Sequence, residues 1–560
     1  MTEEYPRPWR EQFPPEVPVD MPPVPVSSLA ERIDMACREY ADRPAFTNMG
    51  TTLSFSQIGE LSDAVAAYLL GELGLSKGDR VVVQMPNVLQ FPIIEFGILK
   101  AGMIPVNMNP LYTVPEMRVL LDEARPRAFF VLENFAYKIA KLVPETTIDA
   151  FIVTGAADVF GAGKRAAVSV GLKVRRMVPA YQIPGVIHFR EVLRVGRGRP
   201  YTRPEISLDD VALLQFTGGT TGRPKGAMLT NRSLLSNGQQ MLEEMRVVLR
   251  EGEDVVIAAL PLYHIFCLTV NCITFFSFGL HNVLVTNPRE VDVLARIIVR
   301  RRPALMMVVT TLANALLDAP RFQRGDLSSF KFCVSGGAAL DPTTAERWLR
   351  RVGTPIVEGY GLTEASPVVA VSPTWRLPET RMGTVGLPLP STEIRILDES
   401  GADLPLEEAG ELWVSGPQVM AGYWGHPEET QEVLSQDGWL DTGDIAVLHA
   451  DGSFSIVDRR KDMICVSGFN VYPTEVEQAL RQIPGIRDAG VIGVPDQHSG
   501  EVVKAFLVRD DPSVTEQAVR RAARTRLAGY KRPKHIEFCS ELPISETGKV
   551  LRRSLRAPEK

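Results

Sequence analysis

The chain has 560 residues, which is too long for one hydrophobic core, so its length predicts two or more domains. Hydrophobic residues make up 45% of the chain and charged residues 23%, the balance of a soluble globular protein. The formal net charge is -6 and the pI is near 5.8, which argues against nucleic-acid binding, because proteins that bind nucleic acid are usually basic.

The cysteines and the N-terminus favour a cytoplasmic protein. The six cysteines form no C-x-x-C pair, and no histidine pair has metal-ligand spacing, so they are typical of small core residues in a reducing compartment. The first residues include Glu3 and Glu4 and lack the apolar segment of a secretory signal. Residues 1–27 contain eight prolines and predict an extended arm.

From Ser28 onward, the apolar spacing alternates between a helical period and short continuous runs. This pattern predicts parallel strands joined by covering helices. The expected elements are helices over residues 28–40, 55–70 and 89–101 and strands over residues 81–85 and 104–107. Residues 155–171 and 195–203 are rich in glycine and arginine and are expected to be surface excursions.

Residues 217–226 read T-G-G-T-T-G-R-P-K-G, a composition suited to binding a phosphate. The glycines allow backbone N–H groups to approach an anion, the threonines add hydroxyl donors, and Lys225 adds a positive charge. The preceding run Val211–Phe216 predicts a buried strand, so the loop should leave a sheet at its carboxyl end, where α/β folds bind ligands. The motif is not a Walker A loop, because Arg223 and Pro224 separate the lysine from the preceding glycine. The alternative is an ordinary glycine-rich connection.

The stretch 255–288 contains no Asp, Glu, Lys or Arg. A membrane span is one interpretation, but Pro261, His264 and Asn271 interrupt the stretch, so no clean apolar segment of about 20 residues remains. Buried strands and a helix lining an apolar cavity are therefore expected. His264 itself, in L-P-L-Y-H-I-F, is either a catalytic group or a satisfied core histidine.

The segment from the phosphate loop to residue 257 is expected to be helical. Two further motifs follow expected strands, the first of which covers residues 330–334. The first motif is S-G-G-A-A-L at residues 335–340, and the second is E-G-Y-G-L-T-E at residues 358–364. The glycines around Tyr360 are expected to leave its ring face free for a flat partner. Thr363 and Glu364 place a hydroxyl beside a carboxylate, which suits a phosphate and its Mg²⁺, whereas a capped turn is the alternative.

Between residues 383 and 456, the sequence pattern changes to short alternating strands separated by glycine and proline turns, which predicts a small β-subdomain. It contains D-T-G-D at 441–444. Asp441 and Asp444 are a candidate glycosidase-like pair, although a carboxylate beside a glycine equally suits ribose hydroxyls.

The charged run D-R-R-K-D at 458–462 is typical of a solvated connector, and the remaining hundred residues are long enough for a separate domain. Residues 520–560 hold twelve Lys or Arg and four Glu, a local excess that favours a polyanionic ligand.

Taken together, these motifs resemble those of the adenylate-forming superfamily of acyl-CoA synthetases, firefly luciferases and nonribosomal peptide adenylation domains. P-I-S-E-T-G-K at 543–549 is the last of six motifs in the expected order. P-L-Y-H-I-F, G-P-Q-V-M-A-G-Y-W and K-D-M-I-C-V-S-G-F-N-V-Y-P are most similar to bacterial long-chain fatty-acid-CoA ligases. Departures are small: Asn231 stands where many relatives have histidine, and Ser335 stands where glycine is common.

The resemblance implies an α/β fold. A large N-terminal domain (28–458) would contain two α/β subdomains and a small β-barrel-like subdomain. A hinge at 459–462 would lead to a smaller, mobile α+β C-terminal domain (463–560). It also implies a two-step reaction, in which a medium- to long-chain fatty acid and ATP give an acyl-adenylate and pyrophosphate, and CoA then displaces AMP.

The implied site residues follow from the positions of the motifs. Glu364 would carry Mg²⁺, Lys461 would be the hinge pivot, and His264 would lie near the carboxylate. Lys549 would bridge the carboxylate and phosphate in the first step only. The catalytic set is Lys549, Glu364, His264 and Thr217. The ATP- and AMP-binding set is Thr217, Gly218, Gly219, Thr220, Thr221, Gly222, Lys225, Gly336, Gly337, Ala338, Glu358, Gly359, Tyr360, Gly361, Thr363, Asp444 and Arg459. The CoA-binding set is Gly468 and Phe469.

Two alternatives stay open: a fatty acyl-AMP ligase that loads a carrier protein, and a nucleotide-binding module without turnover. The expected partners are fatty acid, ATP and CoA and no nucleic acid, with peripheral membrane contact for substrate uptake as one option. The acyl chain length, the physiological pathway and the oligomeric state, for which a homodimer is one option, cannot be derived from the sequence.

Overall fold

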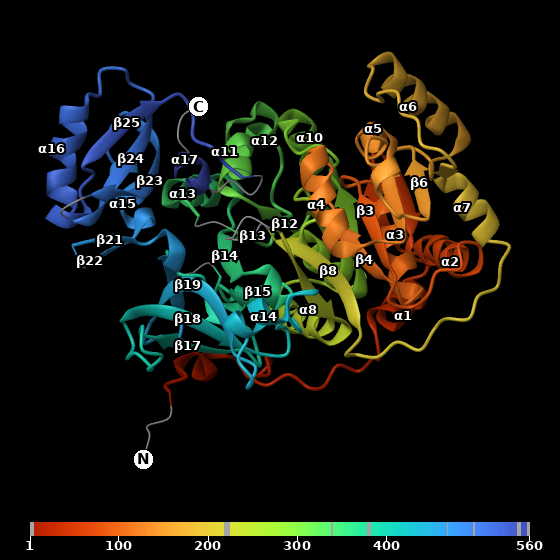
Figure 1. Ribbon diagram of the computed structural model, residues 1–560, viewed down its shortest axis with the longest axis horizontal. Coiled ribbons are helices and arrows are strands. Elements are labelled where there is room, and N and C mark those ends of the chain that lie inside the picture. The colour runs from red at the N-terminus through yellow and green to blue at the C-terminus, as the bar shows by residue number, and fades with distance from the viewer. Residues whose placement is uncertain are drawn as a thin grey trace.

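The computed structural model describes residues 5–217, 224–337, 340–377, 382–467, 469–496, 499–545 and 550–556. Two large sheets lie in the N-terminal part, and a small sheet and a C-terminal domain lie beside them (Figure 1). This is the mixed α/β architecture expected from the sequence. The expected domain boundaries remain a prediction.

The first large sheet has seven strands and provides the phosphate-loop segment. Its order is β7-β6-β5-β3-β4-β8-β9, and all neighbours are parallel except β8 and β9. The strands are β3 (Arg80–Gln84), β4 (Ile104–Asn107), β5 (Ala128–Leu132), β6 (Ala150–Thr154), β7 (Ile187–His188), β8 (Val211–Thr217) and β9 (Lys225–Thr230). Residues 81–83, 106 and 128–131 are buried, as their continuous apolar runs predict for a parallel sheet covered on both faces.

The second large sheet has nine strands in the order β16-β15-β14-β13-β12-β10-β11-β1-β2. Its strands are β1 (Pro44–Asn48), β2 (Thr51–Ser54), β10 (Val255–Ala258), β11 (His281–Leu284), β12 (Leu305–Val308), β13 (Cys333–Gly336), β14 (Ile356–Gly361), β15 (Val368–Val371) and β16 (Leu387–Pro388). In this order, each neighbouring pair of strands from β14 to β1 is parallel. Antiparallel strands close both edges: β2 beside β1, and β15 followed by β16 beside β14.

Helices pack on and between these sheets. They are α1 (Leu29–Glu39), α2 (Phe55–Gly71), α3 (Gln90–Lys100), α4 (Val114–Ala124), α5 (Ala136–Ile139), α6 (Ala162–Val174), α7 (Phe189–Gly196), α8 (Asn231–Met245), α9 (Ile265–Cys267), α10 (Val291–Arg301), α11 (Thr310–Asp318), α12 (Pro320–Arg324) and α13 (Pro342–Val352). A capping box at Ser54 starts α2, because its hydroxyl accepts from the Gln57 N–H and the Gln57 side chain returns to the Ser54 N–H.

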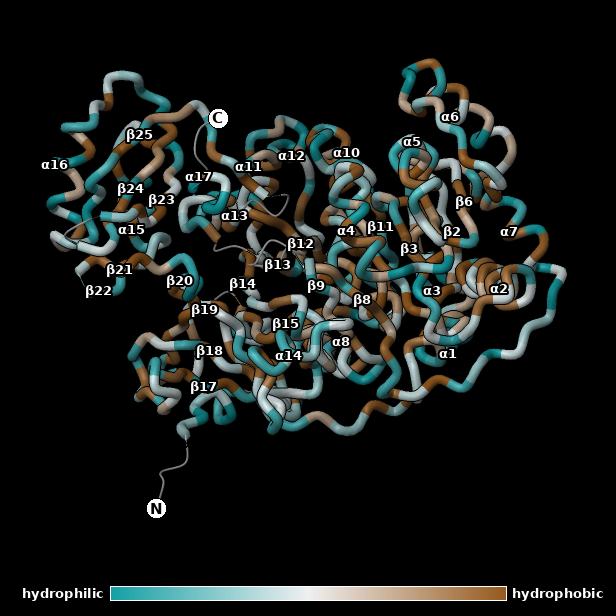
Figure 2. The backbone as a smooth tube through the Cα atoms, in the orientation of Figure 1, coloured by the Kyte–Doolittle hydropathy of each residue, from teal (hydrophilic) through white to brown (hydrophobic). Residues whose placement is uncertain are grey.

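An aromatic cluster joins the two sheets and explains why they are held together. The ring of Phe276 lies 4.6 Å from that of Phe55, 4.8 Å from Phe96 and 5.5 Å from Phe46, centroid to centroid. Each such pair contributes about 0.5–1.5 kcal/mol beyond the burial of its area. Figure 2 shows the hydrophobic colour concentrated along inner strands and the hydrophilic colour on outer helices.

Most of the charge-free stretch 255–288 is buried, as expected, although His264 and Asn287 are exposed. It forms β10, α9, a π-helix at Leu268–Phe275 and β11. Among the residues that the structure describes, no helix is long and apolar enough to cross a membrane. All six cysteines are free, but Cys465 is exposed, so the expectation of core cysteines is wrong at this position.

The small β-subdomain is a four-stranded antiparallel sheet in the order β17-β18-β19-β20. Its strands are β17 (Glu393–Leu397), β18 (Ala409–Ser415), β19 (Leu440–Leu448) and β20 (Phe454–Arg459). The helix α14 (Pro427–Val433) lies between β18 and β19 in the chain. The described strands leave the sheet open, with β17 and β20 at its edges. The proline-rich arm packs on this sheet through Trp9, so the arm is anchored, and residues 8–12 form a 3-10 helix instead of an extended chain.

The C-terminal part has its own sheet and its own hydrophobic core. Its strands are β21 (Ile464–Val466), β22 (Phe469–Val471), β23 (Ile486–Asp496), β24 (Gly500–Arg509) and β25 (His535–Cys539). Its helices are α15 (Pro473–Arg481), α16 (Glu516–Arg526) and α17 (Arg552–Arg556). A separate core is what permits this part to move as a unit.

Two local expectations need correction. The segment after the phosphate loop begins with β9 instead of a helix, because Lys225–Thr230 pairs with β8 before α8 starts. The strand expected at 330–334 starts three residues later, at Cys333. By contrast, α6 (162–174) lies on the surface, in agreement with the first expected excursion, and α7 ends at Gly196, where the second begins.

Candidate active site

The phosphate-loop motif connects two antiparallel strands at the edge of the seven-stranded sheet. Thr217 is paired with Lys225, and Phe216 with Gly226. Because β8 runs parallel to β4, Thr217 stands at the carboxyl end of the sheet, as the sequence predicts. The candidate residues Gly218, Gly219, Thr220, Thr221 and Gly222 lie outside the described residues.

A segment from the small β-rich region holds the second strand of this hairpin in place. The Met228 N–H donates to the Gly422 carbonyl over 2.9 Å, and the Trp424 N–H donates to the Gly226 carbonyl over 2.8 Å. These bonds place the ring of Tyr423 against the loop lysine, whose Nζ lies 5.2 Å from the ring centroid.

Tyr423 also contacts the candidate metal ligand. Its hydroxyl donates to Oε1 of Glu364 over 2.9 Å, and the Met420 N–H donates to the Glu364 carbonyl over 2.8 Å. Burial, together with the carboxylate of Glu364, raises the pKa of Tyr423. Lys225 and Glu364 therefore both contact the side chain of Tyr423. The sequence analysis did not single out Tyr423, although G-P-Q-V-M-A-G-Y-W was among the motifs that carried the resemblance.

The two glycine-containing motifs lie side by side on β13 and β14. Gly336 is paired with Gly359, and Ser335 with Glu358. A Cβ at Gly361 would lie 2.0 Å from the Pro367 carbonyl oxygen, so only glycine fits where β14 meets β15.

Glu358 holds two loops in place. Its carboxylate accepts hydrogen bonds from the N–H of Leu340 and from that of Gly383, over 3.1 and 3.4 Å. Burial raises the pKa of Glu358 above its ordinary value. Its contribution to this region is therefore the placement of the Leu340 and Gly383 loops. Ala338 lies outside the described residues, while Gly337 adopts a positive φ of 89°.

Tyr360, Asp444 and Arg459 come together, as the family motifs imply. The Tyr360 hydroxyl donates to Oδ2 of Asp444 over 2.6 Å, and Arg459 Nε lies 3.2 Å from Oδ1 of the same carboxylate. Burial and this carboxylate raise the pKa of Tyr360. The ring of Tyr360 is edge-on to Phe454 at 5.9 Å, so one end of the tyrosine is fixed by the small sheet.

Asp441 lies on the same strand as Asp444 but has a different partner. Its Oδ2 lies 2.6 Å from Arg460, which also lies 2.6 Å from Glu411. Asp441 is thus engaged in an ion pair, whereas Asp444 faces Tyr360. This arrangement does not favour the glycosidase-like pair.

His264 lies at the N-terminus of α9 and is exposed, so it is not a core histidine. Two residues later, Phe266 approaches the nucleotide segment: a Cβ at Gly336 would lie 3.3 Å from its ring. The candidate CoA residue Phe469 is exposed and stacks on Tyr530, with 4.8 Å between ring centroids. Gly468 and Lys549 lie outside the described residues.

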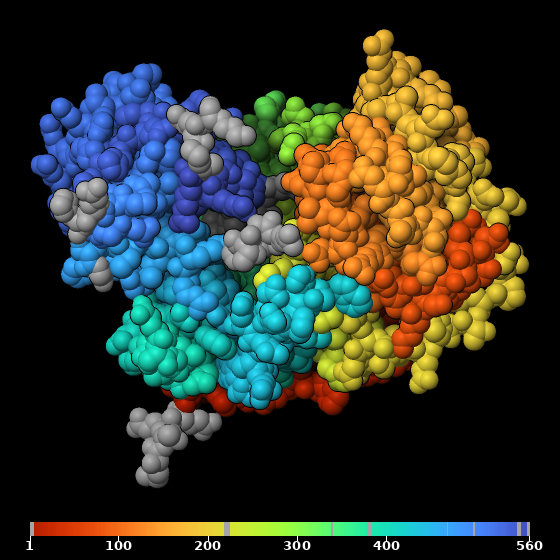
Figure 3. All heavy atoms as spheres, in the orientation of Figure 1, coloured from red at the N-terminus to blue at the C-terminus, as the bar shows by residue number. Residues whose placement is uncertain are grey.

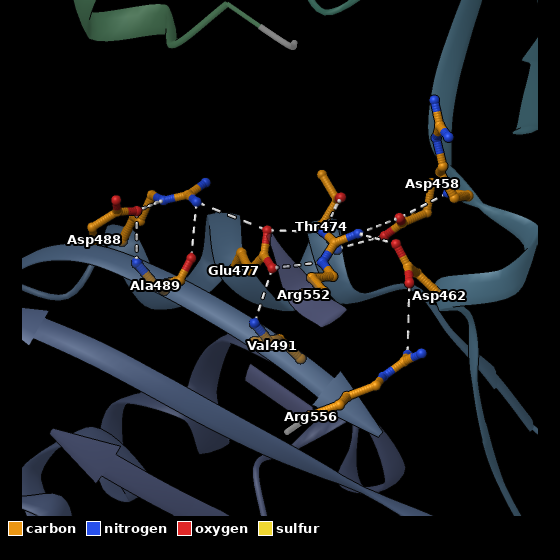
Figure 4. A network of polar contacts seen from close by, with 11 residues as sticks. Asp458, Asp462, Thr474, Glu477, Asp488, Ala489, Val491, Arg552 and Arg556 are labelled. Carbon is orange, nitrogen blue, oxygen red and sulfur yellow. Dashed lines mark hydrogen bonds and ion pairs between the residues drawn. The ribbon is translucent and has the colours of Figure 1, made fainter. Parts of the chain in front are cut away.

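The connector is more buried than its five charges predict. The Asp458 side chain is only 2% exposed and lies 2.8 Å from Arg552 of α17 (Figure 4). Residues Arg460–Asp462 form one 3-10 turn after β20. Burial and the charge of Arg459 lower the pKa of Lys461. The prediction of a solvated connector is therefore wrong for Asp458, whereas the side chain of Lys461 is exposed, as predicted.

A metal would find few ligands here. In the described part of the chain, no group of three or more His, Cys, Asp or Glu side chains is placed to hold an ion. One carboxylate from Glu364 is still compatible with Mg²⁺, because that ion usually takes one or two carboxylates together with substrate phosphates.

Comparisons with known proteins agree with this geometry. Residues 33–424 match the family described as AMP-binding enzyme, and residues 475–549 match the AMP-binding enzyme C-terminal domain. The chain is 46% identical over 549 residues to the long-chain-fatty-acid–CoA ligase of Salmonella typhimurium (98% of this chain, 97% of that protein). It is 37% identical over 558 residues to the enzyme of the same name from Bacillus subtilis (99% and 98%).

Solved structures show the same fold. The anthranilate CoA ligase AuaEII in complex with anthranoyl-AMP has a TM-score of 0.81 at 25% identity, over 98% of each chain. ATP-bound MatB from Rhodopseudomonas palustris has a TM-score of 0.77 at 27% identity, over 94% of this chain and 98% of that one. Because the AMP-binding family covers well over half of the sequence and relatives match it nearly end to end, this chain belongs to the AMP-binding enzyme family.

Proposed function

We propose that this chain is an ATP-dependent long-chain fatty acid–CoA ligase of the AMP-forming type. A fatty acid and ATP give an acyl-adenylate and pyrophosphate, and CoA then gives acyl-CoA and AMP. The observation that carries the proposal is the 46% identity, over 98% of the chain, to enzymes named for this reaction.

The chemistry explains why the site consists of charge-bearing and donor groups. A thiol does not displace an oxygen of a carboxylate at a useful rate, whereas AMP is a good leaving group. The protein therefore supplies positioning and neutralisation of charge at the α-phosphate and the reacting carboxylate. Such a site needs few covalent catalysts and many fixed donors.

The proposed roles follow the elements described above. Thr217, the loop 218–222 and Lys225 bind the pyrophosphate portion, and Thr363 contacts the α-phosphate. The segments around Gly336 and Tyr360 border the adenine, and Asp444 accepts from the ribose hydroxyls with support from Arg459. Lys549 bridges carboxylate and phosphate in the first step, and His264 lies near the thiol entry. Gly468 and Phe469 border the CoA path.

Mg²⁺ would be held by Glu364 together with the phosphates, where it would neutralise their charge. The hydrogen bond from Tyr423 to Oε1 supports this role, because it fixes the carboxylate and leaves Oε2 for a further contact. The cation Lys225 on the same tyrosine ring would face the same phosphates.

The test of function is a fatty-acid series, with chains of about six to about eighteen carbons, assayed for pyrophosphate and for acyl-CoA. Each added CH₂ that becomes buried contributes about 0.8 kcal/mol, so kcat/KM should rise with length until the acyl site is full. We expect equal amounts of both products. Pyrophosphate without thioester in the presence of CoA would identify an acyl-AMP ligase, and neither product would identify a binding module.

Glu364→Gln tests the metal carboxylate. Because metal clamps on phosphoryl groups contribute several kcal/mol, this change should lower the rate of adenylate formation by roughly a hundredfold or more. The measurement is fatty-acid-dependent pyrophosphate release over a range of Mg²⁺ concentrations. Glu399→Gln, at an exposed position of the small β-subdomain, is the matched control and should keep the wild-type rate. Near wild-type release by Glu364→Gln would remove this residue from the site.

We propose that residues 459–462 are the hinge between the N-terminal domain (28–458) and the C-terminal domain (463–560). Lys549 and Gly468 serve different steps, so the C-terminal domain must present different faces to one pocket. Hinges are a few connector residues that absorb large φ/ψ changes. The separate hydrophobic core after the connector supports such movement.

Lys461→Pro tests the pivot. Proline fixes φ near −65° and restricts the preceding residue, so one domain orientation should remain while the other is lost. Pyrophosphate release should stay close to wild type while acyl-CoA formation falls by at least about tenfold, a split that a hinge restriction predicts. Lys461→Ala, which leaves the backbone free, should not show this split. If both rates of Lys461→Pro fall together, rotation about Lys461 is not the switch.

We also propose that the enzyme takes up fatty acid at anionic membranes through α6. Between residues 162 and 177, the chain has five cations and no Asp or Glu, although the whole protein carries -6. Val168 and Leu172 pack toward the core, whereas Val170, Val174 and Met177, at helical spacing, are 60%, 76% and 49% exposed. Figure 3 shows this part projecting from the surface. A basic face with an exposed apolar stripe supports binding in a lipid interface.

A charge-reversal variant tests this surface. Lys173→Glu, Arg175→Glu and Arg176→Glu together should lower partitioning to phosphatidylglycerol-containing vesicles by roughly a hundredfold or more, since each cation near an anionic membrane contributes about 1 kcal/mol. Co-sedimentation gives the measurement, and pure phosphatidylcholine vesicles give the background. Reversal of the exposed Arg296, Arg300 and Arg350 is the matched control. Equal loss in both variants, or no loss, would contradict a role for α6.

A further inference from the structure

Arg552 is the hub of a buried ionic network at the base of the C-terminal domain (Figure 4). Its Nε and Nη2 form a two-pronged pair with Glu477, over 3.1 and 3.0 Å. Its Nη1 donates to Asp458 over 2.8 Å and to Asp462 over 3.4 Å. One guanidinium thus contacts three carboxylates, and its two-pronged pair with Glu477 uses the planar fork of donors that is specific to arginine.

Two of these carboxylates are the two ends of the connector. Asp458 is the second-last residue of β20, in the small sheet, and Asp462 closes the 3-10 turn that follows. Glu477, by contrast, lies on α15 within the C-terminal domain. Asp458 also accepts from the Thr474 N–H over 2.7 Å. The bonds from Arg552 and Thr474 to Asp458 therefore cross the proposed hinge, and Lys461 lies between the two connector aspartates.

The network is energetically demanding because its members are buried. As whole residues, Asp458 is 5% and Glu477 is 3% exposed, so neither carboxylate is well solvated. Charged groups in such surroundings are tolerated only with good hydrogen-bonded partners. Arg481 and Arg556 add weaker contacts, 3.8 Å from Glu477 and 3.6 Å from Asp462. Arg552 is therefore the principal counter-charge of Asp458 and Glu477, and it shares Asp462 with Arg556.

The same arginine directly follows the segment that carries Lys549. An isolated bridge pairs Ile544 with Val550, and the Leu551 N–H donates to the Pro543 carbonyl over 2.7 Å. Val550 packs with Phe506 of β24 and Ile492 of β23. Val550 is thus fixed on the C-terminal sheet and paired with Ile544, and Arg552, two residues later, ties this base to the connector.

We propose that Arg552 is a positioning residue that sets the connector conformation and the placement of Lys549 together. By holding Asp458 and Asp462 against the base of the lysine segment, it stabilises one orientation of the C-terminal domain, the one in which Lys549 serves adenylate formation. This inference rests on the proposed function. Rotation toward the thioester step must break the bonds from Arg552 and Thr474 to Asp458, while the pair with Glu477 stays inside the moving domain.

The test measures the two half-reactions of Arg552→Gln separately: fatty-acid-dependent pyrophosphate release, and acyl-CoA formation from supplied acyl-adenylate. Adenylate formation should fall by at least about tenfold, because small misplacements of a reacting group are costly, while the supplied adenylate is still converted. Arg552→Lys should recover only part of the loss, since an ammonium cannot make the two-pronged contact.

Arg487→Gln is the matched control. Arg487 donates to Asp510 and to the Ser540 carbonyl in the same domain, away from the connector and Glu477. It should leave the ratio of the two rates unchanged. Thermal unfolding of each variant reports folding, and Asp458→Asn, which removes one charge and keeps the shape, gives the same readout should Arg552→Gln not fold.

The outcomes separate cleanly. A selective loss of adenylate formation in Arg552→Gln or Asp458→Asn supports the inference. Equal loss of both half-reactions, or an unchanged ratio, overturns it and leaves Arg552 as a structural residue. If the wild-type chain itself performs neither half-reaction, the proposed function fails instead, so the two failures are distinguishable.

Discussion

The site depends on the backbone pairing between β9 and the segment 421–424. This pairing is remote in sequence, and it carries Tyr423 from the β-rich region to the carboxyl end of the seven-stranded sheet. There, the tyrosine hydroxyl reaches Glu364, which follows β14 of the nine-stranded sheet. Three separately folded parts thus meet at one side chain. Backbone hydrogen bonds fix such a meeting more firmly than exposed ion pairs do, because exposed pairs contribute about 0–1 kcal/mol.

The nucleotide side of the site is built by the same rule. Tyr360 extends from β14 to Asp444 on β19, and the edge of its ring lies on Phe454. The carboxylate that the family motif assigns to ribose is therefore already oriented by a tyrosine and an arginine. Preorganised groups of this kind need no rearrangement when charge develops. Arg459, the partner of Asp444, is itself part of the connector 458–462, so the segment that leads to the C-terminal domain is tied directly to this carboxylate.

The sequence predicts the central strands well, because parallel strands buried on both faces leave continuous apolar runs such as Val81–Gln84. It does not predict β9, since K-G-A-M-L-T has no such run and its partner strand comes before the glycine-rich loop. The family motifs predicted that Tyr360, Asp444 and Arg459 belong to one site, and the three side chains do lie together. Tyr423 and the partners of the connector were not predicted, because Arg552 is 94 residues from Asp458 and local spacing says nothing about such a pair.

The contacts of the connector change the interpretation of its charged residues. Five consecutive charged residues usually mark a solvated link. A fully solvated link would not fix the orientation of the C-terminal domain. Burying Asp458 against Arg552 makes one orientation a defined state. Arg460, held by Asp441 and Glu411, keeps the middle of the run on the small sheet. Lys461 is left between the two anchored ends. In the proposed mechanism, two chemical steps use two defined orientations and a short segment between them. A connector anchored at Asp458, Arg460 and Asp462 leaves Arg459 and Lys461 between the anchors, and Arg459 is itself held by Asp444, so the proposed change of φ and ψ is concentrated at Lys461.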